Sequence, residues 1–206
     1  MLHHPVHGPV IASPPPAFDG ERLIADTRRI CEAAMRFWHG ERPAKAVPFQ
    51  RYVFMLRTVD EGYGGLEHLN STALIAGRKA LPRPGETPGD DYITLLGLIS
   101  HEYFHAWNVK RLRPAELVPY HYGRENYTDL LWFFEGFTSY YDDLLLLRAG
   151  CVDVAGYLKQ LNKAVDSVQA MPGRAIHSLA QASFEAWTKY YRQDANTPNA
   201  TVSYYT

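Results

Sequence analysis

The sequence predicts an α+β fold that is mostly helical, with a small β-sheet placed before the central helix. Two observations carry this prediction. A run at 51–59, rich in aromatic and β-branched residues, has the composition of a buried strand. Most of the chain after residue 94 instead shows apolar residues at helical spacing. With 206 residues, of which 46% are hydrophobic and 21% charged, the chain can form one large domain, or one domain with two lobes, around a sizeable core.

The first sixty residues are predicted to form a tail, a helix and the strand. Residues 1–20 contain five prolines, which exclude a regular helix, so we expect a Pro-rich tail or linker there. A helix should begin near Asp19 or Gly20, because apolar residues then follow on one side, and it should end near Gly40. The strand at 51–59 comes after a proline-bracketed loop.

A turn and an extended segment are predicted next. Residues 62–65 include three glycines and should form the turn, and the segment at 66–75 should be extended, as a candidate sheet edge. Residues 81–91 contain three prolines and two glycines and are predicted to form an exposed loop.

The helix pattern at 95–108 carries the strongest chemical signal. His101 and His105 are four residues apart, so they share one helix face and can offer two imidazole nitrogens to one metal ion. Glu102, beside the first histidine, would lie near a metal-bound water. This H-E-x-x-H arrangement is typical of zinc hydrolases, but the bare pattern also occurs by chance and requires a third protein ligand. Cations and a proline at 110–114 predict the end of this helix.

The next helix offers a candidate for the third ligand. Thr128 is predicted to cap a long helix that runs to residue 147. Glu135 is a lone acid among apolar residues of this helix, where a carboxylate is costly to bury unless it is paired or binds a metal. The alternative is an acid that points outward at a helix start. Further helices are predicted at 153–168 and 178–187.

Composition and charge exclude several classes of partner. A formal charge of −1, without a lysine or arginine block, argues against a nucleic-acid partner. No apolar run approaches the length of a membrane span, and no signal peptide is visible, which leaves bacterial cytoplasm and periplasm both open. Cys31 and Cys151 are too few for a disulfide framework, so we expect reduced thiols. The sequence does not determine the oligomeric state.

Two motifs resemble those of a known family. Residues 100–111 (SHEYFHAWNVKR) and 134–141 (FEGFTSYY) are similar to the glycyl aminopeptidase family, zinc peptidases of the gluzincin clan that usually carry a PDZ domain. The resemblance covers essentially residues 20–206 and extends to the segments at 64–72, 172–174, 178–180 and 203–206. It implies a thermolysin-like zinc peptidase domain at 21–206, with a helical second lobe, truncated so that it lacks an N-terminal β domain and a C-terminal PDZ region.

The resemblance also implies the roles of the metal-site residues. His101, His105 and Glu135 would bind Zn²⁺. Glu102 would be the general base that takes a proton from the zinc-bound water and passes it to the leaving amine.

The substrate contacts implied by the resemblance lie in two other segments. The segment with Gly65 and Glu67 resembles the exopeptidase loop of aminopeptidase N-type enzymes, so Glu67 would bind the free α-ammonium of a peptide substrate. A structural salt bridge is the alternative role for Glu67. Tyr205 would donate a hydrogen bond to the oxyanion, with its neighbour Tyr204 as the alternative.

The sequence departs from thermolysin at one position, and it leaves several alternative functions open. Ser139, and not an acid as in thermolysin, stands four residues after Glu135, so the group that orients the histidine rings must come from elsewhere. The sequence predicts a zinc aminopeptidase that releases small N-terminal residues, glycine or alanine. The alternatives are a non-catalytic scaffold that binds peptide N-termini, an inactive truncated fragment of the peptidase, and an endopeptidase, which would not need Glu67.

Overall fold

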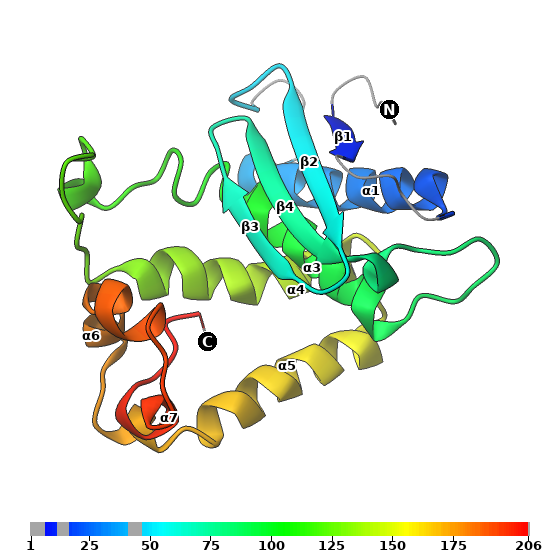
Figure 1. Cartoon of the computed structure of the whole chain (residues 1–206). Helices are drawn as coiled ribbons and strands as arrows, with labels where there is room; N and C mark the ends of the chain where they lie inside the picture. The colour runs from blue at the N-terminus through cyan, green and yellow to red at the C-terminus, as the bar shows by residue number, and fades with distance from the viewer. Residues whose placement is uncertain (1–6, 12–16, 41–46, 206) are drawn as a thin grey trace. The chain divides into compact units, whose positions relative to one another are not determined.

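A computed structural model describes residues 7–11, 17–40 and 47–205, with the backbone alone described for 7–11 (Figure 1). The chain divides into two compact units. The first unit comprises Met1–Ala106 and Asp142–Tyr157, and the second comprises Trp107–Tyr141 and Leu158–Thr206.

A mixed four-stranded sheet lies in the first unit, in the order β1-β2-β4-β3. Strand β2 pairs in parallel with both β1 and β4, whereas β3 runs antiparallel to β4 and forms one edge of the sheet (Figure 1). The predicted strand at 51–59 is confirmed as β2. The strands span His7–Ile11 (β1), Tyr52–Val59 (β2), Tyr63–Glu67 (β3) and Ser71–Gly77 (β4).

The sheet differs from the sequence predictions in two places. The predicted turn at 62–65 is placed too late: β3, which begins at Tyr63, runs opposite to β2, so the chain reverses at 60–62. It reverses again at 68–70, within the segment predicted to be extended. Strand β1 lies within the predicted tail or linker at 1–20, and its Pro9 is tolerated because β1 is an edge strand. Residues 1–6 and 12–16 of that predicted tail lie outside the described residues.

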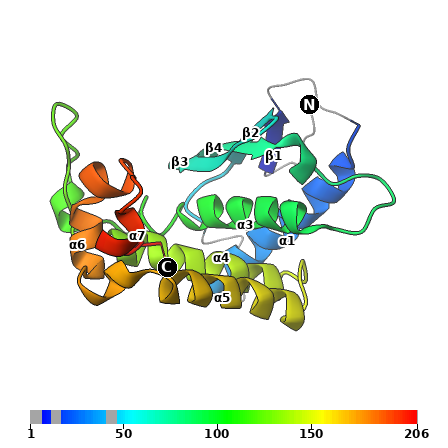
Figure 2. The ribbon, with the colours of Figure 1, turned by 60° about the horizontal axis from the view of Figure 1, so that its bottom comes forward.

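Two long helices complete the core of the first unit. Helix α1 (Gly20–His39) begins where predicted, with Asp19 Oδ1 accepting a hydrogen bond from the Arg22 N–H at 2.9 Å. Helix α3 (Asp90–Phe104) lies against one face of the sheet (Figure 2). The buried apolar side chains of these elements include Leu23, Ile30, Ala34, Phe54, Leu56, Leu74, Leu95, Leu96, Ile99, Tyr103 and Phe104.

Helix α3 ends earlier than the sequence predicted. Its last residue is Phe104, and the helix does not continue to 110–114. His105 keeps a helical backbone conformation, and its N–H still donates to the His101 carbonyl at 3.2 Å. Beyond it, two backbone N–H groups donate to the Trp107 carbonyl, so hydrogen-bonded turns replace the expected helix end.

Short helices and turns make up most of the second unit. The helix predicted at 153–168 is confirmed as α5, and the one at 178–187 as α6 followed by a π-helical turn at Ala186–Tyr190. Thr128 does not stand at the N-cap of a helix: its hydroxyl accepts from the Leu130 N–H at 3.2 Å, but the π-helical turn that precedes α4 begins at Trp132, with Leu131 at its N-cap. These elements span Trp132–Gly136 (π-helical turn), Phe137–Arg148 (α4), Val154–Gln169 (α5), Leu179–Phe184 (α6) and Thr197–Ala200 (α7); residues 142–148 of α4 and 154–157 of α5 belong to the first unit.

The second unit has its own small core. It consists of Ala182, Ala186, Val202 and Tyr204, which bring α6 and the π-helical turn after it against the C-terminal segment. Among the helices in the described part of the chain, none is both long enough and apolar enough to cross a membrane.

Candidate metal centre

The two histidines lie in the last turn of α3 and at its C-cap. His105 is buried and His101 is half-buried, and their ring centroids are 4.6 Å apart with nearly perpendicular planes. The backbone hydrogen bond from the His105 N–H to the His101 carbonyl preserves the helical spacing at the point where α3 ends. Both rings are therefore presented by one turn of backbone, as the i, i+4 spacing predicted.

A half-buried aspartate that was not predicted from the sequence orients His101. Asp142 Oδ2 lies 2.9 Å from His101 Nδ1, and the Asp142 carbonyl accepts a hydrogen bond from the Ser100 hydroxyl at 3.0 Å. With Nδ1 donating to the carboxylate, His101 has Nε2 left as its metal-binding nitrogen. Burial raises the pKa of Asp142, while the hydrogen bond and charge of His101 act in the opposite direction.

Asp142 supplies the orienting carboxylate that Ser139 does not. It lies seven residues after Glu135, which is two helical turns further along. The only sequence signal for this role was the i, i+7 spacing of the two acids. Nothing local in the sequence distinguishes Asp142 from its neighbour Asp143, so its role depends on the tertiary contact with His101.

The Glu102 side chain is enclosed by the sheet. It is 5% exposed, and the Tyr52 hydroxyl donates to its backbone carbonyl at 3.2 Å. A Cβ atom at Gly65 would collide with the Glu102 carboxyl group, so only glycine allows β3 to cross so closely above it. On the other side, Thr72 Oγ1 of β4 lies 3.4 Å from Glu102 Oε2.

Strand β3 presents its open edge beside this carboxylate. The His68 N–H donates to the Ser71 carbonyl at 2.8 Å, so the alternation of an antiparallel ladder makes Gly65 and Glu67 non-hydrogen-bonded positions. Their backbone N–H and C=O groups therefore point away from β4, toward the open edge. Because side chains alternate along a strand, the Glu67 side chain shares the face on which Gly65 meets Glu102.

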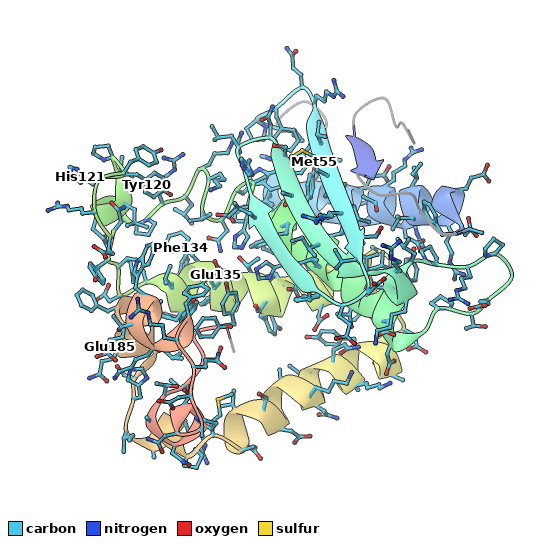
Figure 3. All side chains as sticks on the ribbon, viewed as in Figure 1. Met55, Tyr120, His121, Phe134, Glu135 and Glu185 are labelled. Carbon is cyan, nitrogen blue, oxygen red and sulfur yellow. The ribbon has the colours of Figure 1, made fainter. Side chains whose placement is uncertain are left out.

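Glu135 lies in the second unit, in the π-helical turn that precedes α4 (Figure 3). Hydrogen bonds on both sides hold this turn: the Trp132 N–H donates to Ser183 Oγ at 2.9 Å, and Asn108 Nδ2 donates to the Phe134 carbonyl at 3.3 Å. Glu135 is half-buried.

A cavity of about 550 Å³ in the second unit has Glu135 in its wall. Most of its lining is aromatic or aliphatic, and the polar groups of Thr128 and Ser183 are already engaged in hydrogen bonds within the protein. The cavity therefore offers a largely apolar surface next to the Glu135 carboxylate. The remaining lining residues are Leu117, Tyr120, Asn126, Tyr127, Leu131, Ala186, Trp187, Tyr191 and Tyr204.

The C-terminal tyrosines approach the same turn. A Cβ atom at Gly136 would lie 2.9 Å from the Tyr204 carbonyl oxygen, so the glycine permits this close approach. Tyr204 is 2% exposed and belongs to the core of the unit, whereas Tyr205 is half-buried. Burial, followed by the negative charge of Glu135, raises the pKa of Tyr205, so its phenol stays protonated and can donate a hydrogen bond.

The three predicted ligands fit a metal ion. His101, His105 and Glu135 each offer one ligand atom, and these atoms lie within 4.8 Å of one another. Two imidazoles and a carboxylate are the donor set of catalytic zinc sites that keep a further position open.

Two comparisons with known proteins found similar sequences or structures. A family model described as M61 glycyl aminopeptidase matches residues 94–206. The crystal structure of an aminopeptidase N family protein from Idiomarina loihiensis matches with a TM-score of 0.91 and 42% sequence identity, covering 100% of this chain and 34% of that chain. This chain thus spans about a third of the length of that protein. No curated protein matches.

Proposed function

This chain belongs to the M61 glycyl aminopeptidase family of metallopeptidases, and from that premise we propose that it is the catalytic part of a zinc aminopeptidase. The substrate would be a peptide with a free N-terminus and a small first residue, glycine or alanine. The observation that carries the proposal is the Glu102 carboxylate, enclosed beneath the open edge of β3 and adjacent in sequence to a paired histidine ligand.

His101, His105 and Glu135 would hold the metal, and Asp142 would keep the His101 ring in its binding orientation. Zinc, when bound, supplies a Lewis acid that lowers the pKa of a bound water toward about 7. Glu102 would take the proton of the attacking water and deliver it to the leaving amine. Its enclosure supports this role because a base acts only from a fixed position within reach of the proton.

The open edge of β3 would align the substrate. An extended peptide can add as a further strand to the N–H and C=O groups of Gly65 and Glu67 that point away from β4. The Glu67 carboxylate, on the same face as Glu102, would then bind the α-ammonium group. The Tyr205 hydroxyl would donate to the oxyanion of the tetrahedral intermediate, which its raised pKa supports.

Zinc content and hydrolysis together test the proposal. We expect about one zinc per chain by elemental analysis, lost in His101→Ala. Glu102→Gln should retain the metal but slow hydrolysis of alanine and glycine peptides by about 10²–10⁴-fold. Absence of metal from zinc-supplemented protein would contradict the ligand set, and unchanged activity of Glu102→Gln would contradict the assigned base.

A second comparison tests the aminopeptidase character. Glu67→Gln should reduce the preference for free over N-acetylated peptides, because it removes the charge that pairs with the ammonium group. Glu61→Gln is the matched control, since Glu61 is an exposed acid shortly before β3. Equal cleavage of blocked and free peptides by the unaltered protein would favour an endopeptidase, and peptide binding without turnover would favour a binding scaffold.

A further inference from the structure

Thr72 is a buried threonine that no part of the proposed reaction uses. It lies in β4 opposite Glu67, and its side chain is fully buried. Its hydroxyl reaches the Glu102 carboxylate, so it shares the sheet face on which Gly65 meets that carboxylate. The Glu102 carboxylate is thus covered by the backbone of Gly65 in β3 and by the hydroxyl of Thr72 in β4.

The hydroxyl has one proton and two acceptors. Thr72 Oγ1 lies 3.2 Å from the Leu66 carbonyl oxygen and 3.4 Å from Glu102 Oε2. Both distances exceed the usual range for a hydroxyl donor, about 2.5–3.0 Å, as expected where one proton is shared between two acceptors. An ionised carboxylate is the stronger acceptor, so the proton favours Glu102 whenever Glu102 carries its charge.

We propose that Thr72 is a positioning residue for Glu102: its hydroxyl donates to Oε2 and fixes the carboxylate plane beneath Gly65. This inference rests on the proposed role of Glu102 as the general base. The hydrogen bond fixes the position of Oε2. Because the carboxylate is planar, this also fixes the direction of Oε1, the oxygen that would face the reacting water. The Leu66 carbonyl gives the same hydroxyl a second partner in β3, which ties the base to the strand proposed to align the substrate.

Two substitutions distinguish the contribution of the Thr72 hydroxyl from that of its methyl group. Thr72→Val keeps the shape and removes the donor, and we expect kcat to fall by about tenfold while KM stays within about twofold. Thr72→Ser keeps the donor and removes a buried methyl group, so it should retain most of kcat with a lower melting temperature. Thr58→Val is the control, because Thr58 is a buried threonine of the neighbouring strand β2 and lies opposite Ala76.

The readouts are kcat and KM separately, zinc content, and the Glu102 side-chain conformation in a crystal structure of Thr72→Val. The inference requires unchanged zinc content and a displaced or multiply oriented Glu102 carboxylate in that variant. A wild-type kcat for Thr72→Val, or an equal loss in Thr72→Ser, would overturn it, since the second result indicates packing alone. Glu102→Gln, assayed in parallel, identifies failure of the premise: if that variant stays active, the assigned base is wrong whatever Thr72 does.

Discussion

The two glutamates to which we assign the general base and a metal ligand lie in contrasting surroundings. Glu102 is 5% exposed, enclosed by a glycine and a threonine from two adjacent strands and by the helix that carries it. Glu135 is half-buried, on a π-helical turn that forms part of the wall of a largely apolar cavity. Their partners differ as well, since the sheet holds the first whereas short helices and the C-terminal segment surround the second.

The contrast shows that two carboxylates of the same chemistry have different surroundings, which fit the different roles proposed for them. A general base benefits from a rigid, water-poor setting that fixes one proton-transfer geometry. A metal ligand beside a cavity keeps room for a substrate next to it. The first unit should therefore tolerate little change around Glu102, whereas changes around Glu135 should act more through the substrate and the C-terminal segment.

Among substitutions of the residues that surround the two glutamates, the largest effect is expected on the Glu135 side. Tyr205→Phe removes the proposed oxyanion donor, so we expect kcat to fall by about 10²–10³-fold with zinc content and unfolding temperature unchanged. Tyr204→Phe is the neighbouring control, and it should affect stability more than kcat because Tyr204 belongs to the core. The reverse pattern would assign the oxyanion role to Tyr204.

On the Glu102 side, Gly65→Ala should displace the base. The added Cβ collides with the Glu102 carboxyl, so we expect a loss of about 1–3 kcal/mol in the free energy of unfolding and a fall in kcat of at least about tenfold. Gly89→Ala is the matched control, because a Cβ at Gly89 meets nothing within 4 Å. Wild-type kcat in Gly65→Ala would show that Glu102 can move without consequence.

Beside the histidine pair, Asp142→Asn should weaken metal binding without abolishing it. The amide cannot fix the His101 ring as the carboxylate does, so we expect about 10–10²-fold lower metal affinity. Competition with a zinc chelator measures this affinity. Asp143→Asn is the matched control on the same helix. An equal loss of metal affinity in both variants would contradict the proposal that Asp142 orients His101.

The smallest effect concerns the stability of the second unit. The Lys189 hydrogen bond, followed by that of His177, lowers the pKa of Glu185 below its ordinary value of 4.5. A lowered folded-state pKa stabilises the protein above the unfolded-state pKa, and this contribution is lost as the pH falls through the folded-state value. Glu185→Gln should therefore lower stability at pH 7 by less than about 1 kcal/mol, since the group is partly exposed, and by less still at pH 3. Thermal unfolding at both pH values measures the difference, and an equal loss at both would contradict the assigned cause.

Local patterns in the sequence determined the parts of this protein that depend on a few consecutive residues. Helix α1, strand β2 and the histidine pair were predictable because capping, β-branched composition and the i, i+4 spacing act within one or two turns. Glu135 stood out because a lone acid in an apolar run requires a partner. The family was recognisable from the two motifs that surround these residues.

Only the tertiary structure decided what surrounds them. Gly64 and Gly65, predicted to belong to a turn, lie instead in the edge strand β3, where a Cβ at Gly65 would collide with Glu102. Asp142 and Thr72 reach the site over separations of 41 and 30 residues, and no local pattern marks such contacts. Sequence periodicity specifies which face a side chain occupies within its own element, but the partner that meets that face is set by how distant elements pack.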